Sequence, residues 1–518
     1  MPTTTRFLLL TLPQLLMSWA LAAAVSLPDI FTDHLVLQRE QVVPVWGMAA
    51  PGEAVRVSFG GQEQRTIADE EGKWRVHLSP MEASATPRDL TVSGKNTIVL
   101  TDILVGEVWL LTGQSNMQWR VLESDGGQEA IEAADYPEIR LFNVSREVSF
   151  GRRPGKLATW ERCSPETVPE FSGVGYFFGL ELYRKLGIPV GLINSSYGGS
   201  QAEAWTPRSY LAADEDLAPT IAREEMWAAE RPQVQRDYDA AVRAWQAERD
   251  AAEAAGTRVP RVPRTPDALR DYRIAGSIYG NMIEPLIPYA IRGVAWYQGE
   301  SNEDRAEQYE ELLTTMIRAW RDRWEQGAFP FAIVQLPNFR ATDPEPQDLA
   351  WSHLRDRQRR VANDVENAGL IVTIDVGEAN DIHPTNKLDV GQRLARWALT
   401  DVYGEAVPAG GPVYRDVTFA DGAATVVFDR VGEGLRLTEG DAPREFAVSG
   451  ADGRWYWAEA RIAGRDRIVV RSPKVPKPVA VRYAFNNNPE HPNLTNETGI
   501  PAGPFRTDDR PGPTHGRR

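Results

Sequence analysis

Residues 108–117 read VWLLTGQSNM, and this stretch decides which class of fold the chain can form. It opens with a short apolar run, which is typical of a strand that is buried on both faces. A glycine then marks a turn, and Ser115 and Asn116 are residue types that favour turns and helix caps. The stretch therefore predicts a strand, a tight turn at Ser115 and the start of a helix.

Around this stretch, β-rich runs alternate with amphipathic helical stretches between about residues 104 and 404. The other predicted strands are residues 139–144, 190–194, 293–297, 331–335 and 370–373, and the clearest predicted helices are 176–185, 307–324 and 348–363. This alternation favours a parallel sheet with helices on both faces. In such sheets the reacting groups collect at the carboxyl ends of the strands.

The regions on either side of this α/β part have a different pattern. Residues 25–103 consist of short alternating runs separated by turn residues, which predicts a small N-terminal β-sandwich domain. The pattern returns over residues 405–506 and predicts a C-terminal β domain. We expect residues 507–518 to form a disordered tail.

One polar segment interrupts the α/β part. Residues 206–273 are rich in Ala, Glu and Arg and close with a Pro-rich stretch at 259–263. This composition predicts a solvated helical hairpin on the surface. A lid over the active site is the alternative, because the insertion directly follows a segment with candidate site residues.

The N-terminus has the order of a secretory signal peptide. Arg6 precedes an apolar run that extends to about residue 24 and ends in small residues. We therefore predict that residues 1–24 are removed and that the mature protein is secreted or periplasmic. A retained membrane anchor is the alternative, although Pro13 interrupts the run. No later stretch reaches membrane length, so no membrane contact is expected after cleavage.

The charge and the reactive residue types exclude several functions. The formal net charge is −15, whereas nucleic-acid binding needs an excess of Lys and Arg, so nucleic acid is not an expected partner. The acidic balance also favours a neutral substrate over a polyanion. The only cysteine, Cys163, has no neighbouring base and is predicted to be structural. The six histidines lack metal-ligand spacing, so no catalytic metal is expected.

Four polar segments follow predicted strands and suit one reaction. They are residues 113–117 (GQSNM), 194–205 (NSSYGGSQAEAW), 296–302 (WYQGESN) and 381–387 (DIHPTNK). Ser115 offers a hydroxyl nucleophile, and His383 is the usual type of base for activating a serine. Asp381 lies two residues from His383 and can orient its ring if the backbone between them is extended.

The same segments offer hydrogen-bond donors for an oxyanion. The backbone N–H of Ser115 lies at the start of the predicted helix, where it can point at a developing negative charge. The paired glycines at 198–199 let the backbone approach a ligand closely, and an amide side chain from residues 296–302 could complete the hole. Trp205 either provides a stacking face for a sugar ring or packs in the protein core.

Taken together, these segments resemble the sialate O-acetylesterase family within the SGNH/GDSL hydrolases. The resemblance rests on the stretches 113–117, 198–199 with 203–205, 296–302, and 382–384 with 386–387. Less central stretches, such as SGVGYFF at 172–178 and QLPNF at 335–339, also look like the family. The likeness covers roughly residues 104–403.

The resemblance implies a flavodoxin-like, three-layer α/β hydrolase domain with flanking β-sandwich regions. It also implies hydrolysis of acetyl esters on carbohydrates without a cofactor. Carried over by position, Ser115 is the nucleophile and His383 the general base. The oxyanion donors are then the N–H groups of Ser115 and Gly199 and a side chain from Gln298 or Asn302. We further expect the substrate to contact Gln114, Trp205 and Glu300.

One departure concerns the acid that orients the histidine. Many SGNH hydrolases place it three residues before the histidine, where this chain has Asn380. We choose Asp381, at minus two, as the triad acid. Glu378, Asp375 and Glu300 are alternatives, as is a dyad without an acid.

The sequence leaves three questions of function open. The acetylated sugar is either a plant hemicellulose oligosaccharide of the xylan type or sialic acid, and the acidic balance favours the neutral plant sugar. A glycoside hydrolase that uses Glu300 and Asp381 is a rival enzyme. A non-catalytic carbohydrate-binding protein, built on the β regions and the 16 tryptophans, is a rival from another class.

Overall fold

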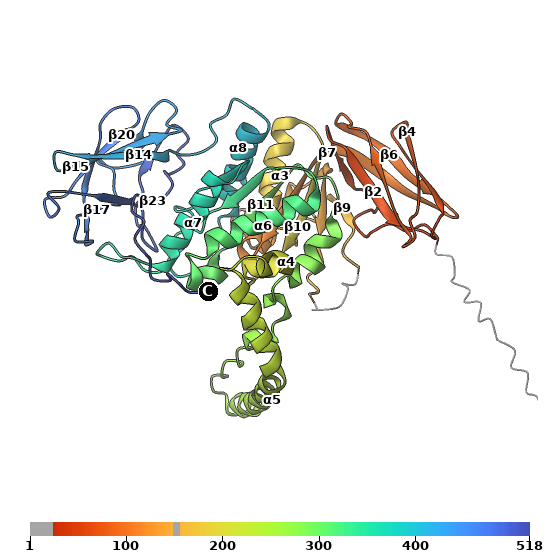
Figure 1. The fold of residues 1–518 in the computed structure, drawn as a ribbon, viewed down its shortest axis with the longest axis horizontal. Helices are drawn as coiled ribbons and strands as arrows, with labels where there is room; N and C mark the ends of the chain where they lie inside the picture. The colour runs from red at the N-terminus through yellow and green to blue at the C-terminus, as the bar shows by residue number, and fades with distance from the viewer. Residues whose placement is uncertain (1–23, 149–155) are drawn as a thin grey trace, which may run out of the picture.

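The predicted sheet lies at the centre of the molecule and has its strands in the order β13-β12-β11-β7-β10-β8-β9 (Figure 1). A computed structural model describes residues 24–148 and 156–518. The bounds of these strands are β7 (Thr97–Gly113), β8 (Tyr136–Asn143), β9 (Trp160–Cys163), β10 (Val190–Ser196), β11 (Gly293–Tyr297), β12 (Phe331–Val334) and β13 (Ala368–Ile371). Neighbours along this order pair in parallel, except that β9 runs antiparallel to β8, so the sheet is mixed.

Strand β7 joins two parts of the molecule. Its first half pairs with the N-terminal β region, and its second half lies between β10 and β11. A boundary at residues 103/104 therefore falls inside one continuous strand. Along the second half, Val108 and Leu110 belong to one hydrophobic core, whereas Trp109 and Leu111 belong to another. Alternate side chains of a strand point to opposite faces, so both faces of the sheet are buried at β7.

Helices supply the other side of each core. Helices α6 (Tyr309–Trp324) and α7 (Ala350–Asp364) contribute to the core that contains Val108, and α3 (Gly173–Leu186) and α8 (Lys387–Trp397) contribute to the core that contains Trp109. The start of α3 is fixed by Ser172, whose hydroxyl accepts a hydrogen bond from the backbone N–H of Gly175 at 3.0 Å. The predicted helices are therefore present as α3, α6 and α7, with ends that differ by a few residues.

The two flanking β regions lie at opposite ends of the molecule (Figure 1). The other strands of the N-terminal region are β1 (Val36–Gln38), β2 (Val43–Met48), β3 (Ala54–Phe59), β4 (Gln62–Ile67), β5 (Lys73–Leu78) and β6 (Ser84–Ser93). The C-terminal strands are β14 (Val413–Ala420), β15 (Ala423–Asp429), β16 (Arg436–Leu437), β17 (Phe446–Ser449), β18 (Trp455–Trp457), β19 (Glu459–Ile462), β20 (Arg467–Arg471), β21 (Ala480–Tyr483), β22 (Leu494–Thr495) and β23 (Phe505–Arg506). The C-terminal region contains two four-stranded sheets, ordered β14-β15-β20-β19 and β18-β17-β21-β23, around a hydrophobic core of its own.

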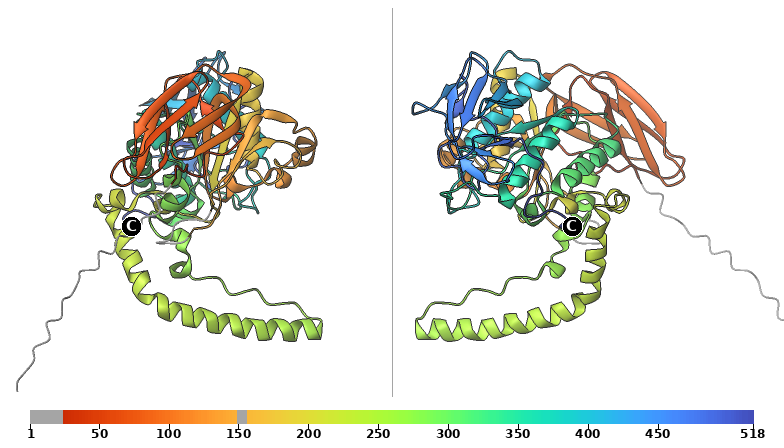
Figure 2. Two further views of the ribbon diagram at one scale, coloured as in Figure 1. Left: turned by 90° about the vertical axis from the view of Figure 1, so that its right-hand side faces the viewer. Right: turned by 60° about the vertical axis from the view of Figure 1, so that its left-hand side comes forward.

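The insertion differs from the predicted helical hairpin. After α4 (Arg208–Ala212) it forms one long helix, α5 (Ala218–Ala255), which projects from the body and returns as an extended segment (Figure 2). The physical reason is that Gly256 ends α5 in the left-handed conformation and the returning residues 257–266 contain three prolines, which cannot continue a helix. Figure 2 also shows that α5 bends, and Pro232 lies inside it.

Both ends of the chain bear on the predictions. The predicted signal peptide, apart from Ala24, lies outside the described residues. No helix among the described residues is long and apolar enough to cross a membrane. Residues 507–518, which we expected to be disordered, instead make hydrogen bonds to the C-terminal sheets and to the hydrolase part of the chain.

Candidate active site

The turn after β7 places Ser115 at the carboxyl end of the central strand. Gly113 has a φ of +131°, and a Cβ at this position would lie 2.2 Å from the carbonyl oxygen of Tyr297. Only glycine fits there, so the chain can turn sharply into the short helix α1 (Ser115–Gln118). Ser115 is the first residue of α1 and is partly exposed.

The structure brings Ser115 and His383 together although 268 residues separate them. The imidazole Nε2 of His383 lies 2.9 Å from the hydroxyl Oγ of Ser115. The ring stacks on Trp119, with centroids 5.4 Å apart and planes 19° apart. The stacking holds the imidazole in the plane in which its Nε2 faces the hydroxyl, which is the geometry that general-base activation of a serine needs.

Asp381 lies beside His383 but does not form a hydrogen bond to its ring. Its Oδ1 accepts the backbone N–H of His383 at 2.9 Å and lies 3.8 Å from Nδ1. This is the local turn that an aspartate favours with the residue two positions later. Asp381 is therefore close enough to interact electrostatically with the imidazole, but its carboxylate is too far from Nδ1 for a hydrogen bond.

The alternative carboxylates are engaged elsewhere. Asp375 pairs with Arg393 through both oxygens, and Glu378 accepts the backbone N–H of Thr385 at 3.2 Å. None of these carboxylates forms a hydrogen bond with the His383 ring within the described ranges. Asp381 is thus the nearest candidate for orienting the ring.

The surroundings of His383 favour its neutral form. Burial lowers the pKa of His383, and the positive charge of Lys387 lowers it further, whereas Asp381 and Glu123 act in the opposite direction. A lowered pKa keeps the imidazole unprotonated at more acidic pH. Only the neutral ring can accept the proton of Ser115.

Asn116, the residue after Ser115, connects three loops of the site. Its amide Nδ2 donates to Glu300 Oε1 at 2.6 Å and to the carbonyl oxygen of Ile382 at 3.0 Å. Its Oδ1 accepts a hydrogen bond from the ammonium Nζ of Lys387 at 2.7 Å. Asn116 therefore ties the loop of the serine to the loop of the histidine and to the loop after β11.

Charges of opposite sign lie at the two ends of this Asn116 network. Lys387 is fully buried, and burial lowers the pKa of its ammonium to about 7. Burial also raises the pKa of the Glu300 carboxyl, whose Oε2 has no hydrogen-bond partner among the described residues. The sequence places Asn116 and Lys387 in two of the stretches that carry the family resemblance, but it does not show that their side chains are in contact.

Two of the predicted oxyanion donors are free. The backbone N–H groups of Ser115 and Gly199 form no hydrogen bond with another described residue, whereas the N–H of Gly198 donates to Gln118 Oε1 at 2.7 Å. Gly199 has a φ of +72°, which favours glycine. Both residues line the same pocket as His383.

The side chains of Gln298 and Asn302 do not reach this pocket, which corrects the sequence-based assignment. The amide Nε2 of Gln298 donates to the Ser200 carbonyl at 3.1 Å and to Asn302 Oδ1 at 2.7 Å. The amide Nδ2 of Asn302 donates to Glu203 Oε2 at 2.8 Å. Both side chains are fully buried, and they satisfy one another and the loops around them.

Gln114 offers a donor in their place. Its Oε1 accepts the backbone N–H of Ser301 at 3.3 Å, and Gln114 lines the pocket. Its amide NH₂ donates to no other residue in the described part of the chain. The sequence predicts that Gln114 contacts the substrate, and this geometry allows it.

Trp205 is a core residue and not a sugar-stacking face, which corrects a second expectation. It has no exposed surface, its indole Nε1 donates to Ser200 Oγ at 2.9 Å, and its ring packs edge-on against Trp296. The aromatic residue that lines the pocket is Trp227 of α5. Sequence reasoning missed Trp227, because it lies in a polar helix with no motif around it.

The pocket that contains Ser115 and His383 has a volume of about 990 Å³. Three parts of the chain line it: the loops with Gln114, Ser115, Gly199, Glu300 and His383; the insertion with Arg223, Trp227, Arg264 and Arg273; and the segment after β23 with Arg517 and Arg518. Such a volume exceeds what an acetyl group alone requires, so the pocket has room for several sugar units.

Cys163 is buried elsewhere, and burial raises the pKa of its thiol to about 12, which agrees with a structural role.

Comparisons with known proteins show similarity to carbohydrate esterases. The family model described as carbohydrate esterase, sialic acid-specific acetylesterase, matches residues 105–255 and 265–400. The chain is 27% identical to the sialate O-acetylesterases of Mus musculus, over 72% of both chains, and of Homo sapiens, over 72% of this chain and 70% of the human one. A crystal structure of a carbohydrate acetylesterase from Xanthomonas citri superposes with a TM-score of 0.78 at 35% identity, covering 94% of this chain and all of that one.

Proposed function

Because the chain belongs to the carbohydrate esterase family of sialic acid-specific acetylesterases, and is thus a carboxylic ester hydrolase, we propose that it removes acetyl groups from sugars with Ser115 as nucleophile and His383 as general base. The observation that carries this proposal is the distance of 2.9 Å between His383 Nε2 and Ser115 Oγ inside a pocket. A serine hydroxyl is a weak nucleophile until a base removes its proton.

The first half of the proposed reaction forms an acetyl-enzyme. Ser115 Oγ attacks the acetyl carbonyl while its proton passes to His383 Nε2. The carbonyl oxygen becomes an oxyanion, which accepts hydrogen bonds from the N–H groups of Ser115 and Gly199. The bond to the sugar oxygen then breaks, and His383 returns the proton to that oxygen, so a sugar hydroxyl leaves.

The second half regenerates the enzyme. A water molecule attacks the acetyl carbonyl as His383 accepts its proton, and collapse of the second tetrahedral intermediate releases acetate and restores the Ser115 hydroxyl. The amide NH₂ of Gln114 is the third oxyanion donor in this proposal. Each such donor contributes about 3 kcal/mol to stabilisation of the transition state.

Asp381 has an orienting role in this mechanism. When Nε2 accepts the serine proton, Nδ1 carries the ring's own proton, and the nearest carboxylate oxygen is Asp381 Oδ1 at 3.8 Å. Catalytic hydrogen bonds are often longer in a free enzyme than in its substrate complex. Even so, we propose that Asp381 orients the ring mainly through its charge, because its Oδ1 already accepts the backbone N–H of His383.

Asn116 and Lys387 act as positioning residues. Asn116 binds the carbonyl of Ile382, so it fixes the backbone directly before His383. Lys387 holds the Asn116 amide oxygen, which leaves the amide Nδ2 to face Glu300 and Ile382. The buried ammonium also keeps the pKa of His383 low through its charge.

We propose a domain organisation and an export route on the same basis. Residues 104–404 form a flavodoxin-like, three-layer SGNH hydrolase domain, which residues 25–103 and 405–506 flank as β-sandwich domains. Helices on both faces of the central sheet and a separate C-terminal core support this division. Residues 1–24 are removed as a signal peptide, and the enzyme acts in the periplasm or outside the cell.

The substrate class follows from the family. We propose acetylated oligosaccharides of the hemicellulose type or O-acetylated sialic acid. The test is acetate release from each, with Ser115→Ala as the control for the nucleophile. Loss of acetate release in the variant supports the proposal, and equal rates in the two proteins contradict it. Acetate release with intact glycosidic bonds also separates this reaction from that of a glycoside hydrolase.

A further inference from the structure

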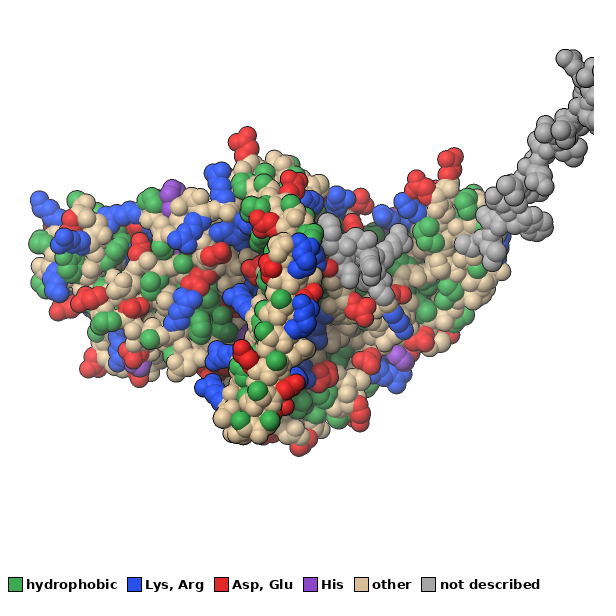
Figure 3. All heavy atoms as spheres, turned by 90° about the horizontal axis from the view of Figure 1, so that it is seen from below, with side chains coloured by type: hydrophobic (Ala, Val, Ile, Leu, Met, Phe, Trp, Pro, Cys, Tyr) green, Lys and Arg blue, Asp and Glu red, His purple; other side chains and the backbone are tan. Residues whose placement is uncertain are grey.

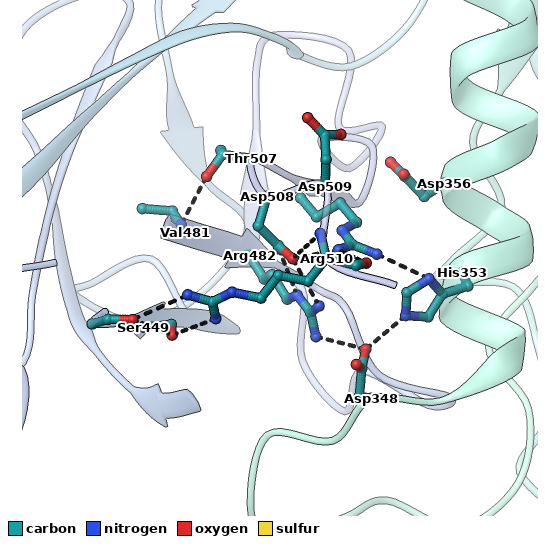
Figure 4. A network of polar contacts seen from close by, with 12 residues as sticks. Asp348, His353, Asp356, Ser449, Val481, Arg482, Thr507, Asp508, Asp509 and Arg510 are labelled. Carbon is teal, nitrogen blue, oxygen red and sulfur yellow. Dashed lines mark hydrogen bonds and ion pairs between the residues drawn. The ribbon is translucent and has the colours of Figure 1, made fainter. Parts of the chain in front are cut away.

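Residues 507–518, which follow β23, run along the surface of the molecule and contact several of its elements. We call this segment the C-terminal strap. Figure 4 shows its first anchor, where the carboxylate of Asp508 accepts a hydrogen bond from Arg482 at 3.1 Å. The guanidinium of Arg510 donates to Ser449 Oγ at 2.9 Å, and the Thr507 hydroxyl accepts the backbone N–H of Val481 at 2.9 Å. These contacts fix the start of the strap to the C-terminal sheet.

The strap then crosses the hydrolase part of the chain. Asp509 pairs with Arg360 of α7 at 2.7 Å. Gly512 lies so close to His353 of α7 that a Cβ would be 2.4 Å from the imidazole Cε1. Thr514 is buried, and its hydroxyl accepts the backbone N–H of Glu307 at 3.4 Å. The path of the strap is therefore determined by contacts at nearly every second residue.

The strap ends at the pocket of Ser115 and His383. Arg517 and Arg518 line that pocket, and the main-chain oxygen of Arg518 accepts a hydrogen bond from Arg223 of α5 at 3.1 Å. Arg518 also forms an ion pair with Asp216. The strap and the insertion thus meet, and together they form the part of the pocket wall that lies beyond the catalytic loops.

The charges of this wall are not balanced. Among the described residues, four acids line the pocket, of which Asp267, Glu303 and Asp304 form ion pairs with Arg273 at 3.0 Å, Arg340 at 2.6 Å and Arg305 at 3.7 Å. The fourth, Glu300, belongs to the buried Asn116 network. Arg264 and Arg517 are exposed and form no ion pair with any residue that the structure describes. Figure 3, which views the molecule from below, shows basic side chains interspersed with acidic ones around the projecting α5. The wall therefore presents surplus positive charge in a protein whose net charge is −15.

We propose that the strap and the insertion form a distal subsite for a sugar unit that carries a carboxylate, with Arg264 and Arg517 as its specificity-determining residues. The inference rests on the proposed function and names its substrate class. A guanidinium binds a carboxylate through charge-assisted, often paired hydrogen bonds. Trp227 of α5 lines the same wall and offers an aromatic face to the sugar ring. The preference for a neutral substrate, inferred from the whole-chain charge, does not apply to this wall.

The experiment compares two acetylated xylo-oligosaccharides that differ only in a glucuronic acid branch. The quantity measured is kcat/KM for acetate release from each, and the ratio of the acidic to the neutral substrate reports the subsite. We expect the wild-type enzyme to prefer the acidic substrate by about tenfold. The preference should decrease with added salt, since screening shortens the range of charge interactions to about 3 Å at about 1 M.

Three variants test the residues and one serves as a matched control. Arg264→Ala, Arg517→Ala and deletion of residues 511–518 should each lower the ratio several-fold, mainly through KM of the acidic substrate. Arg261→Ala removes an exposed arginine of the same segment that does not line the pocket, and the ratio should stay at its wild-type value. The two single substitutions are at exposed positions, so they test the subsite even if the deletion prevents folding.

The outcomes separate the subsite from the proposed function. A wild-type ratio that Arg264→Ala and Arg517→Ala leave unchanged overturns the subsite alone. Equal kcat/KM values of the wild-type enzyme for the two substrates also overturn the subsite and leave the proposed function intact. If the wild-type enzyme releases acetate from neither oligosaccharide nor from O-acetylated sialic acid, the proposed function fails, and the subsite fails with it.

Discussion

The ammonium Nζ of Lys387 lies 2.7 Å from the amide oxygen of Asn116, the residue that follows Ser115. This contact places a buried cation in the same network as the Ser115–His383 pair. A buried lysine that forms no ion pair within 4 Å among the described residues is costly. We infer that the positive charge of Lys387 acts on His383, whose pKa it lowers.

Replacing Lys387 by Met should move the acid limb of the pH–rate profile to higher pH. The base must be neutral to accept the Ser115 proton, so activity is lost as the pH falls through the pKa of His383. Lys387 lowers that pKa, and it is protonated below about pH 7. Removing the charge raises the pKa of His383, and the loss of activity then begins at higher pH. The measurement is kcat/KM between pH 4 and 8.

A structural role alone predicts a different result for Lys387→Met. In that case the rate falls by one factor at every pH and the acid limb stays in place. The charge would then have no effect on the base. A thermal unfolding curve of the variant, recorded beside the kinetics, reports any loss of fold separately.

Gln114→Ala should lower kcat by about a hundredfold while KM changes little, because an oxyanion donor acts on the transition state. The control is Asn302→Ala, which removes a buried amide outside the pocket. That change should lower stability and not kcat of the folded enzyme, because it leaves the Glu203 carboxylate with one partner fewer. If Asn302→Ala lowers kcat and Gln114→Ala does not, the sequence-based assignment of the donor was right.

Asp381→Asn should have a smaller effect than loss of His383. A triad aspartate with a full hydrogen bond to its histidine contributes about 10⁴ in kcat, whereas Asp381 Oδ1 lies 3.8 Å from Nδ1 and mainly binds the backbone. We expect a decrease of about tenfold to a hundredfold, measured as kcat at saturating substrate. A decrease as large as that of His383→Ala would instead indicate a complete triad in the substrate complex.

Trp205→Ala should destabilise the protein, because Trp205 is buried and holds the Ser200 hydroxyl. The free energy of unfolding should fall by about 3–5 kcal/mol, as for other large buried side chains. Chemical denaturation measures this change, and Trp227→Ala is the matched comparison on the pocket wall. If Trp205→Ala raises KM for oligosaccharides without lowering the free energy of unfolding, Trp205 stacks on the sugar and the core assignment is wrong.

The central sheet could be predicted from the sequence because its strands and helices differ in hydrophobic period. The run at residues 293–297 coincides with β11. Residue type and position after a predicted strand point to Ser115 and His383, and the structure places their side chains 2.9 Å apart. Both follow from local patterns, since parallel strands bring their carboxyl ends to one edge.

The details that failed depend on tertiary contacts. Gln298 and Asn302 lie in the segment that the family motif indicates, yet each finds a partner inside the protein, and no local pattern shows which amide is left free. The strap was expected to be disordered because the last residues of a domain are poorly ordered unless specific contacts hold them. It is held by arginines such as Arg482 and Arg360, which are far away in the sequence. A single-sequence pattern does not contain such long-range pairs.

Acetate release is the direct test of whether Ser115, activated by His383, cleaves acetyl esters of carbohydrates. Acetate is measured over time from acetylated xylo-oligosaccharides and from O-acetylated sialic acid, with wild-type enzyme and Ser115→Ala. We expect release by the wild-type enzyme from at least one substrate and a loss of at least about 10⁴-fold in the variant. Equal rates in the two proteins would contradict it, because Ser115 would then be a turn residue and the nucleophile would lie elsewhere.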